Sequence, residues 1–159
     1  MRNARRREPA TPRSVALRLL ARRDYSRLEL AQRLRARGIG AGEIEPLLDD
    51  FERLGYLSDA RYAHALVSQR AGRLGVRAIA RDLHDKGIGA DAAKDALATL
   101  EPRDELRDAI ALWTRRFGTA PVDEREKARQ VRFLIARGYS ISIALKAIRG
   151  DASEADLQS

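Results

Sequence analysis

The sequence predicts an all-α protein of three tandem three-helix modules that stack as a short, elongated, curved solenoid. The main observation is a repeated register: Gly38, Gly87 and Gly138 recur at intervals of 49 and 51 residues. Each glycine follows a cation, lies four residues after a leucine and precedes a large apolar residue, the pattern of a helix that ends at a left-handed glycine. No segment shows the sustained alternation of apolar and polar residues that marks a strand. A register repeated three times indicates a helical repeat protein.

The repeat divides the chain into five segments. They are a disordered basic arm at 1–13, three-helix repeats at 14–57, 58–101 and 102–150, and a frayed acidic tail at 151–159. The arm holds five arginines and two prolines and almost nothing apolar, a composition that cannot bury a core.

In the first repeat, an apolar stripe from Val15 to Leu20 predicts a short first helix, and Ser26 is the expected cap of the second. The third helix is expected to begin at about Glu43. This start places Pro46 in the first turn, where its missing N–H costs no hydrogen bond.

In the second repeat, Ser58 is the expected cap of a helix that runs to about Arg70. Leu57 and Tyr62 then fall at the two positions of a hydrophobic staple. The helix after it, over residues 76–86, carries apolar residues at the i, i+3, i+4 and i+7 positions of one face. A third helix follows from about residue 91.

The third repeat begins with a long helix after Pro102, in which Trp113 is expected to anchor the core. Two further helices are predicted, one from Asp123 to Arg137 and a short last one through Ile148. Tyrosines stand at helix junctions, where a ring can pack while its hydroxyl reaches water: these are Tyr25, Tyr56 and Tyr139.

Composition limits the class of protein. Lys and Arg total 31 against 23 Asp and Glu, and the net charge of +8 favours an acidic partner, most often nucleic acid. The absence of cysteine excludes a disulfide scaffold and a thiolate metal site. No apolar run approaches the roughly 20 residues that span a bilayer. We therefore expect a cytoplasmic protein without a membrane partner.

Basic residues concentrate on the second helix of every repeat. If these helices line up along one face, they form a basic stripe that contacts DNA or a protein partner. We nominate six of its members: Arg33, Arg37, Arg77, Arg81, Arg129 and Arg132. The alternative is a solvated surface whose cations complement helix dipoles, and the sequence leaves both open.

No pattern of catalytic or metal-binding residues emerges. His64 and His84 lack metal-ligand spacing, and both adjoin apolar positions. The glycines at residues 38–42 follow a helix and lack the Gly-Lys-Ser/Thr ending of a phosphate loop, so they mark a helix end. We therefore expect no enzyme, no metal and no cofactor.

The chain resembles one known family. Residues 17–30, the block Gly-Tyr-Leu-Ser-Asp-Ala-Arg-Tyr-Ala at 55–63 and the Lys-Gly-Ile helix end at 86–88 are similar to those of the bacterial recombination regulator RecX. The resemblance covers about residues 14–150. Val76 departs from the residue types expected after Gly75, and the third repeat matches more weakly than the first two.

The resemblance implies a non-enzymatic modulator of the RecA recombinase, and we expect the chain to be a monomer. Such a protein lodges in the groove of the RecA–DNA filament, inhibits its ATPase, strand-exchange and co-protease activities, and also binds DNA directly. Two alternatives stay open: a general, sequence-independent DNA-binding helical module, and a structural adaptor that recognises a protein groove by shape.

Overall fold

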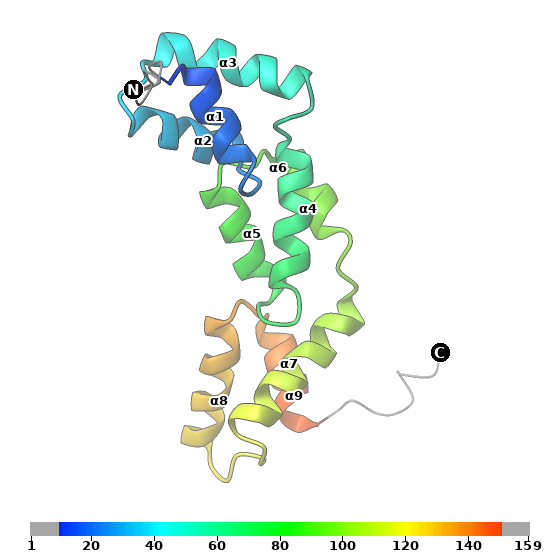
Figure 1. Ribbon diagram of the computed structural model, residues 1–159. Helices are drawn as coiled ribbons and strands as arrows, with labels where there is room; N and C mark the ends of the chain where they lie inside the picture. Colours follow the sequence, from blue (N-terminus) through cyan, green and yellow to red (C-terminus); the bar gives the residue numbers. More distant parts are fainter. Residues whose placement is uncertain (1–9, 151–159) are drawn as a thin grey trace, which may run out of the picture. The chain divides into compact units, whose positions relative to one another are not determined.

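The computed structural model describes residues 10–150 of the 159-residue chain. Within this range the chain forms nine helices and no strand, so the predicted all-α class is confirmed (Figure 1). The helices are α1 (Pro12–Leu20), α2 (Arg27–Arg35), α3 (Ala41–Arg53), α4 (Asp59–Arg70), α5 (Val76–Asp85), α6 (Ala90–Leu97), α7 (Pro102–Arg116), α8 (Glu124–Ala136) and α9 (Ile141–Arg149). They follow one another as three triplets.

The helices gather into two compact units. The first unit contains residues 10–62 together with Lys86–Ile88, and the second contains Ala63–Asp85 and residues 89–150. The elongated, curved arrangement of the modules and the five segment boundaries given above stay predictions. The expected tail and most of the expected arm lie outside the described residues.

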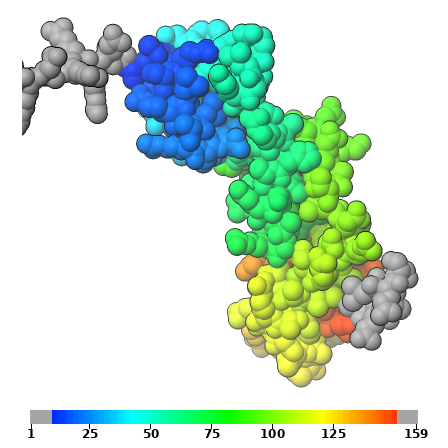
Figure 2. Space-filling model, turned by 45° about the vertical axis from the view of Figure 1, so that its right-hand side comes forward, coloured from blue at the N-terminus to red at the C-terminus, as the bar shows by residue number. Residues whose placement is uncertain are grey.

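The core of the first unit lies between α1, α2 and α3, which pack closely in the space-filling view (Figure 2). Leu30, Leu34 and Phe51 are completely buried in it. Ser26 caps α2 as predicted: its hydroxyl accepts from the backbone N–H of Glu29, and the Glu29 carboxylate accepts from the backbone N–H of Ser26. The two residues form a capping box, which fixes the start of α2.

The first helix begins earlier than predicted, inside the segment expected to be disordered. Pro12 occupies the first helical position, and the Thr11 hydroxyl accepts from the backbone N–H of Ser14 at 3.1 Å. The guanidinium of Arg13 is also held, because it forms an ion pair with Asp50 at 2.6 Å. A threonine cap followed by proline was therefore a helix signal, and the predicted disorder of residues 11–13 is wrong.

The third helix also begins earlier than predicted. The Gly40 carbonyl accepts from the backbone N–H of Ile44 at 3.1 Å, so α3 starts at Ala41 and not at about Glu43. As a result, Pro46 lies inside the helix and not in its first turn.

The glycine after the second helix of each module has the left-handed backbone that the sequence predicts. The φ angles are +80°, +73° and +91° at Gly38, Gly87 and Gly138. The leucine four residues before each glycine is completely buried, as expected: these are Leu34, Leu83 and Leu134. In the first module the N–H of Ile39 donates to the Leu34 carbonyl at 3.3 Å, the bond of a Schellman ending. The leucine and the apolar residue after the glycine thus stand at the two ends of one hydrogen bond.

The turn around Gly87 packs against the start of α2. A Cβ added to Gly87 would stand 2.8 Å from the Cβ of Leu28, so only glycine fits without displacing the leucine. Beside this contact, the backbone N–H of Arg27, the first residue of α2, donates to the Asp59 carboxylate at 2.7 Å. A glycine and an acid from later in the sequence therefore complete the N-terminus of α2.

Glu29 ties the same region together. Its carboxylate accepts from the Lys86 ammonium at 2.6 Å and from the Arg23 guanidinium at 3.3 Å, besides its bond to the backbone N–H of Ser26. Partial burial raises the pKa of Glu29, but these three donors outweigh it and hold the pKa below its ordinary value. The carboxylate therefore stays ionised and bridges α2 to the turn around Gly87.

The main core of the second unit lies between α7, α8 and α9. Leu134 and Ala144 are completely buried in it, and Trp113 packs against it half-buried. The indole N–H of Trp113 donates to the buried Gln130 side chain at 2.8 Å, and the Gln130 amide donates to the Thr119 carbonyl at 3.2 Å. These bonds satisfy a polar side chain inside an otherwise apolar core.

The turn around Gly138 packs against the start of α5. A Cβ on Gly138 would stand 2.4 Å from the Ala78 Cβ, and a Cβ on Gly75 would stand 2.5 Å from the Gly138 carbonyl. At this close approach the backbone N–H of Gly75 donates to the Arg137 carbonyl at 2.8 Å, and that of Arg77 donates to the Gly138 carbonyl at 3.3 Å. The end of α8 thus supplies acceptors to the start of α5.

An acid again completes the contact. The backbone N–H of Val76, the first residue of α5, donates to the Glu105 carboxylate at 3.0 Å. The bond matches the one from the first residue of α2, Arg27, to Asp59. In the first and second modules, a carboxylate from later in the sequence therefore accepts the N–H of the first residue of the second helix.

The expectation for the Tyr139 hydroxyl is wrong. Because Tyr139 follows Gly138 directly, the turn that packs against α5 carries its ring into the core between Ala109 and Leu134. The side chain is 1% exposed, and its hydroxyl has no hydrogen-bond partner among the described residues. Tyr56, in contrast, is exposed at its junction, as predicted.

Candidate functional site

Ion pairs divide the arginines of α2 into two groups. Arg27 contacts three carboxylates of α3 at 2.8–2.9 Å, those of Glu45, Asp49 and Glu52. Arg35 reaches one of the same acids at 3.4 Å. Arg33 and Arg37 are exposed and form no ion pair within residues 10–150. The acidic face of α3 therefore neutralises one side of α2 and leaves the other side basic.

The guanidinium of Arg27 belongs to the folded scaffold. Burial lowers its pKa, but hydrogen bonds to Glu45 and Asp49 and the charge of Glu52 outweigh this effect and hold the pKa above its ordinary value. A cation held by three acids has little capacity left for an external anion. Arg27 is therefore a poor candidate for a binding residue, although the sequence places it on the same helix as Arg33.

Arg37 lies in a basic hollow of the first unit. The side chain donates to the Arg33 carbonyl at 3.0 Å, and Arg18 of α1 and Arg22 of the turn after α1 line the same hollow of about 270 Å³. Its remaining lining is apolar, from Val15 and Leu19. Three guanidinium groups that share a hollow without a carboxylate partner in residues 10–150 favour an anion.

On α5 the two predicted arginines lie one turn apart. Arg77 and Arg81 stand at i and i+4, both exposed and neither in an ion pair among the residues described. The acid that follows Arg81, Asp82, pairs with Arg70 of α4 at 3.3 Å. The backbone N–H of Arg77 is fixed by its bond to Gly138. The outer side of α5 is therefore basic as well.

On α8 the predicted Arg129 and Arg132 share a hollow of about 420 Å³ with Arg125. The three follow i, i+4, i+7 spacing and so lie on one face of the helix. Asp123 and Glu126 also line the hollow, but both accept from backbone N–H groups at the start of α8, at 2.7 and 3.0 Å. The acids are engaged in the helix cap, and the arginines stay available.

All six predicted arginines are thus exposed and free of carboxylate partners within residues 10–150. The structure brings them together in pairs, one helix at a time. Their alignment as one continuous stripe stays a prediction. Sequence reasoning missed three further arginines, Arg18, Arg22 and Arg125. The signal for them was spacing: Arg22 follows Arg18 by four residues, and Arg129 follows Arg125 by four residues.

The described part of the chain holds little that resembles a chemical centre. His64 and His84 both lie on the surface. No group of three or more His, Asp or Glu side chains in residues 10–150 could hold a metal ion. Across the same residues, none of the helices has the length and apolar character needed to cross a bilayer.

These features define the class of protein: a tandem repeat of three-helix modules that presents unpaired arginines. Three family models match in order, the first, second and third three-helix domains of RecX, at residues 13–51, 58–97 and 103–148. The chain belongs to the RecX family of regulatory proteins. This membership agrees with the expectation of a protein that is not an enzyme.

Relatives and solved structures agree with the models. The chain is 46% identical to regulatory protein RecX of Leptothrix cholodnii, over 84% of this chain and 85% of that one. It is 38% identical to the protein of the same name from Ralstonia nicotianae, over 91% and 90%. The crystal structure of RecX from Lactobacillus salivarius has the same fold, with a TM-score of 0.76 over 92% of this chain and 95% of that one, at 22% identity.

Proposed function

We propose that this protein regulates the RecA recombinase by binding in the groove of the RecA–DNA filament. There it inhibits ATP hydrolysis, strand exchange and co-protease activity, and it acts as a monomer inside the cell. Membership of the RecX family supports this role. So does the repeat architecture, because a row of small modules can contact more than one subunit of a helical filament. A ligand that prefers one filament state shifts the filament toward it without reaching the nucleotide.

The contribution of the basic residues rests on one observation. Arg33, Arg37, Arg77, Arg81, Arg129 and Arg132 have no carboxylate partner among the described residues, whereas other arginines on the same helices or beside them do. Arginines kept free of internal pairing are available to phosphates. We assign direct DNA contact to these six, with Arg18, Arg22 and Arg125 as additional members.

The deciding experiment measures RecA-catalysed ATP hydrolysis and strand exchange with and without the full chain. Binding to bare single-stranded and double-stranded DNA is measured in parallel. Inhibition at stoichiometric or lower ratios, under salt that abolishes bare-DNA binding, supports action on the filament. Absence of inhibition at saturating protein rejects the proposed function.

The second candidate is a sequence-independent DNA-binding module. The same unpaired arginines favour it, since phosphate contacts carry no sequence information. Its distinguishing property is that inhibition follows DNA occupancy and declines with salt at the same slope as bare-DNA binding. A regulator that recognises the recombinase itself still inhibits at salt concentrations that abolish its binding to bare DNA.

A further inference from the structure

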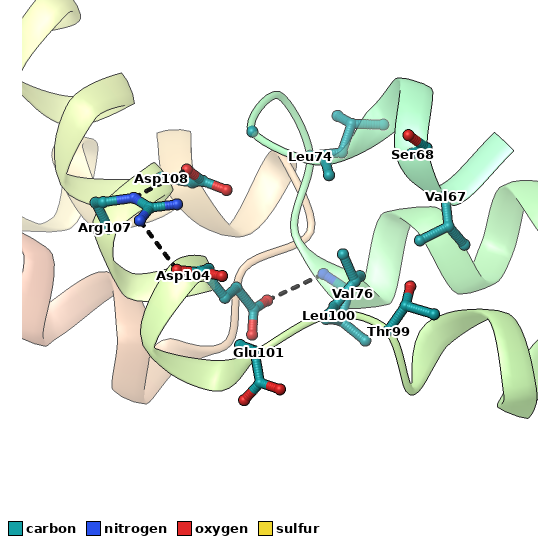
Figure 3. A pocket seen from close by; sticks show the side chains of 13 residues that line it. Val67, Ser68, Leu74, Val76, Thr99, Leu100, Glu101, Asp104, Arg107 and Asp108 are labelled. Atoms are coloured by element: carbon teal, nitrogen blue, oxygen red, sulfur yellow. Dashed lines mark hydrogen bonds and ion pairs between the residues drawn. The ribbon is translucent and has the colours of Figure 1, made fainter. Parts of the chain in front are cut away.

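A hollow of about 310 Å³ opens in the second unit where the end of α4, the end of α6 and the start of α7 meet (Figure 3). Its floor is apolar and comes mainly from Val67, Leu74, Val76 and Leu100. The volume lies at the lower end of the range of ligand pockets, about 300–1,000 Å³, and suits a single long side chain.

One wall of this hollow is acidic. It consists of the first two turns of α7 and contributes Glu101, Asp104, Glu105 and Asp108 against a single cation, Arg107. We call the space between this wall and the apolar floor the acidic hollow. A net negative hollow contrasts with a chain whose net charge is +8.

The acids of this wall are only partly engaged. Arg107 pairs with Asp104 at 3.0 Å and with Asp108 at 3.9 Å, and Glu105 accepts from the backbone N–H of Val76 (Figure 3). The Glu101 carboxylate has no hydrogen-bond or ion-pair partner within residues 10–150. It does not cap α7, although Glu101 stands at the cap position. A helix start needs fewer acids than this wall supplies.

A buried polar group beside the same acids also lacks a partner. The Tyr139 hydroxyl is enclosed and makes no hydrogen bond to any described residue. Burial, followed by the charges of Asp108 and Glu105, raises its pKa to about 12, so it remains a neutral hydroxyl next to the wall. Tyr139 does not line the hollow, so the unused hydrogen-bonding capacity of the hollow itself is that of the Glu101 carboxylate.

We infer that the acidic hollow binds an arginine or lysine side chain of a protein partner. The apolar stem of such a side chain covers Val67, Leu74 and Leu100, while its cation meets Glu101 and Asp104 at the edge. This division of apolar stem and charged head matches the two surfaces of the hollow. Nucleic acid does not fit, because its phosphates would face a net negative wall.

The identity of the partner rests on the proposed function, which makes it the recombinase filament. The hollow would then contact protein while the arginines of α2, α5 and α8 contact DNA. Two surfaces of opposite charge would explain how one chain engages a filament made of both components.

The test compares two charge reversals in the full chain, Glu101→Lys in the hollow and Glu43→Lys as the control. Glu43 is also exposed, unpaired in the described residues and placed at a helix start, but it lies in the first unit. Affinity is measured for RecA filaments on single-stranded DNA and for the bare DNA. We expect Glu101→Lys to weaken filament binding about tenfold, because reversal removes an attraction and adds a repulsion, each of up to about 1 kcal/mol. Bare-DNA binding should stay within twofold, and Glu43→Lys should leave both affinities near those of the parent.

A second variant blocks the hollow and leaves its acids in place. Ala71 is exposed at the entrance, so Ala71→Arg introduces a cation that the wall itself can pair with. It should weaken filament binding as Glu101→Lys does. Equal filament affinities for Glu101→Lys and Glu43→Lys would overturn the inference and leave the acids as helix-start charges only.

A filament-free measurement separates this inference from the proposed function. The ¹⁵N-labelled full chain is titrated with the peptide acetyl-Leu-Arg-Leu-amide and, as control, with acetyl-Leu-Glu-Leu-amide. Only the arginine peptide should shift the amides of residues 71–74, 100–101 and 103–105, and Glu101→Lys should abolish the shifts. If the arginine peptide leaves them unmoved, the hollow is not a basic side-chain site, whether or not the protein binds the filament.

Discussion

Replacing Gly138 by alanine should force apart the end of α8 and the start of α5. The added Cβ would stand 2.4 Å from the Ala78 Cβ and 2.5 Å from the Ala78 backbone nitrogen, and neither atom can rotate away. Relief requires that the turn move off α5. The movement stretches the bond from Gly75 to Arg137 at 2.8 Å and the bond from Arg77 to Gly138 at 3.3 Å.

The free energy of unfolding that Gly138→Ala should lose has two parts. A left-handed backbone costs a residue with a Cβ roughly 1–2 kcal/mol, and the φ of +91° at Gly138 incurs this cost. Loss of the two backbone hydrogen bonds adds about 1 kcal/mol each. Gly138→Ala should therefore destabilise the second unit by about 3–4 kcal/mol.

Gly38→Ala is the matched control, because Gly38 has a φ of +80° and nothing within 4 Å of an added Cβ. It should cost only the backbone part, roughly 1–2 kcal/mol. Urea unfolding gives both free energies, and amide hydrogen exchange at Gly75 and Arg77 reports the contact directly. If the two variants were equally stable, or if exchange at these amides were unchanged in Gly138→Ala, the proposed role of the contact would be refuted.

Three further predictions concern charge and the core. Arg33→Gln should weaken DNA binding and lower its salt slope by about one, whereas Arg27→Gln should leave the slope nearly unchanged, as binding measured at several salt concentrations would reveal. The pKa of Glu29 is lowered in the fold, so its stabilisation is present above the unfolded pKa of about 4.3 and lost as pH falls through the folded value. The difference in unfolding free energy between the parent and Glu29→Gln should therefore vanish in acid, in urea titrations across pH. Trp113→Phe should cost about 1–3 kcal/mol by leaving the buried Gln130 oxygen without its donor, and Gln130→Leu in the same chain should restore part of the loss in urea unfolding.

Helix ends were predictable from the sequence because their signals are local. The Schellman bond joins residues only five apart, so Leu34, Gly38 and Ile39 carry the whole signal. The contact of Gly138 with Ala78 joins residues 60 apart and depends on how α8 packs against α5. The sequence identified Gly138 as a helix stop and gave no indication of this second role.

The candidate site, like the helix ends, was predictable where it depends on a single helix and not where it depends on packing between helices. Exposure of Arg33 follows from the helical register, because Leu30, Ala31 and Leu34 form the buried stripe of α2 and Arg33 lies outside it. Its freedom from ion pairs does not follow, since Arg27 lies on the same helix and is held by three acids of α3. Charge counting along a helix cannot distinguish the two, because pairing depends on which side α3 covers.

The hydrogen bonds at the start of the second helix make one module depend on the module that follows it. Gly75 precedes α5 and has no side chain with which to cap it, so its N-terminal donors are satisfied by Glu105, Arg137 and Gly138 from the third module. No later module follows α8 in the described chain, and this helix is capped from within, by the Asp123 side chain at 2.7 Å.

The second module therefore needs the third for a complete helix start, whereas the third does not need a successor. This dependence is a physical reason for terminal repeats to differ from internal ones. It also accounts for where the acids stand in the sequence. The acid that caps α8 can directly precede that helix, whereas Glu105 must reach Val76 from α7.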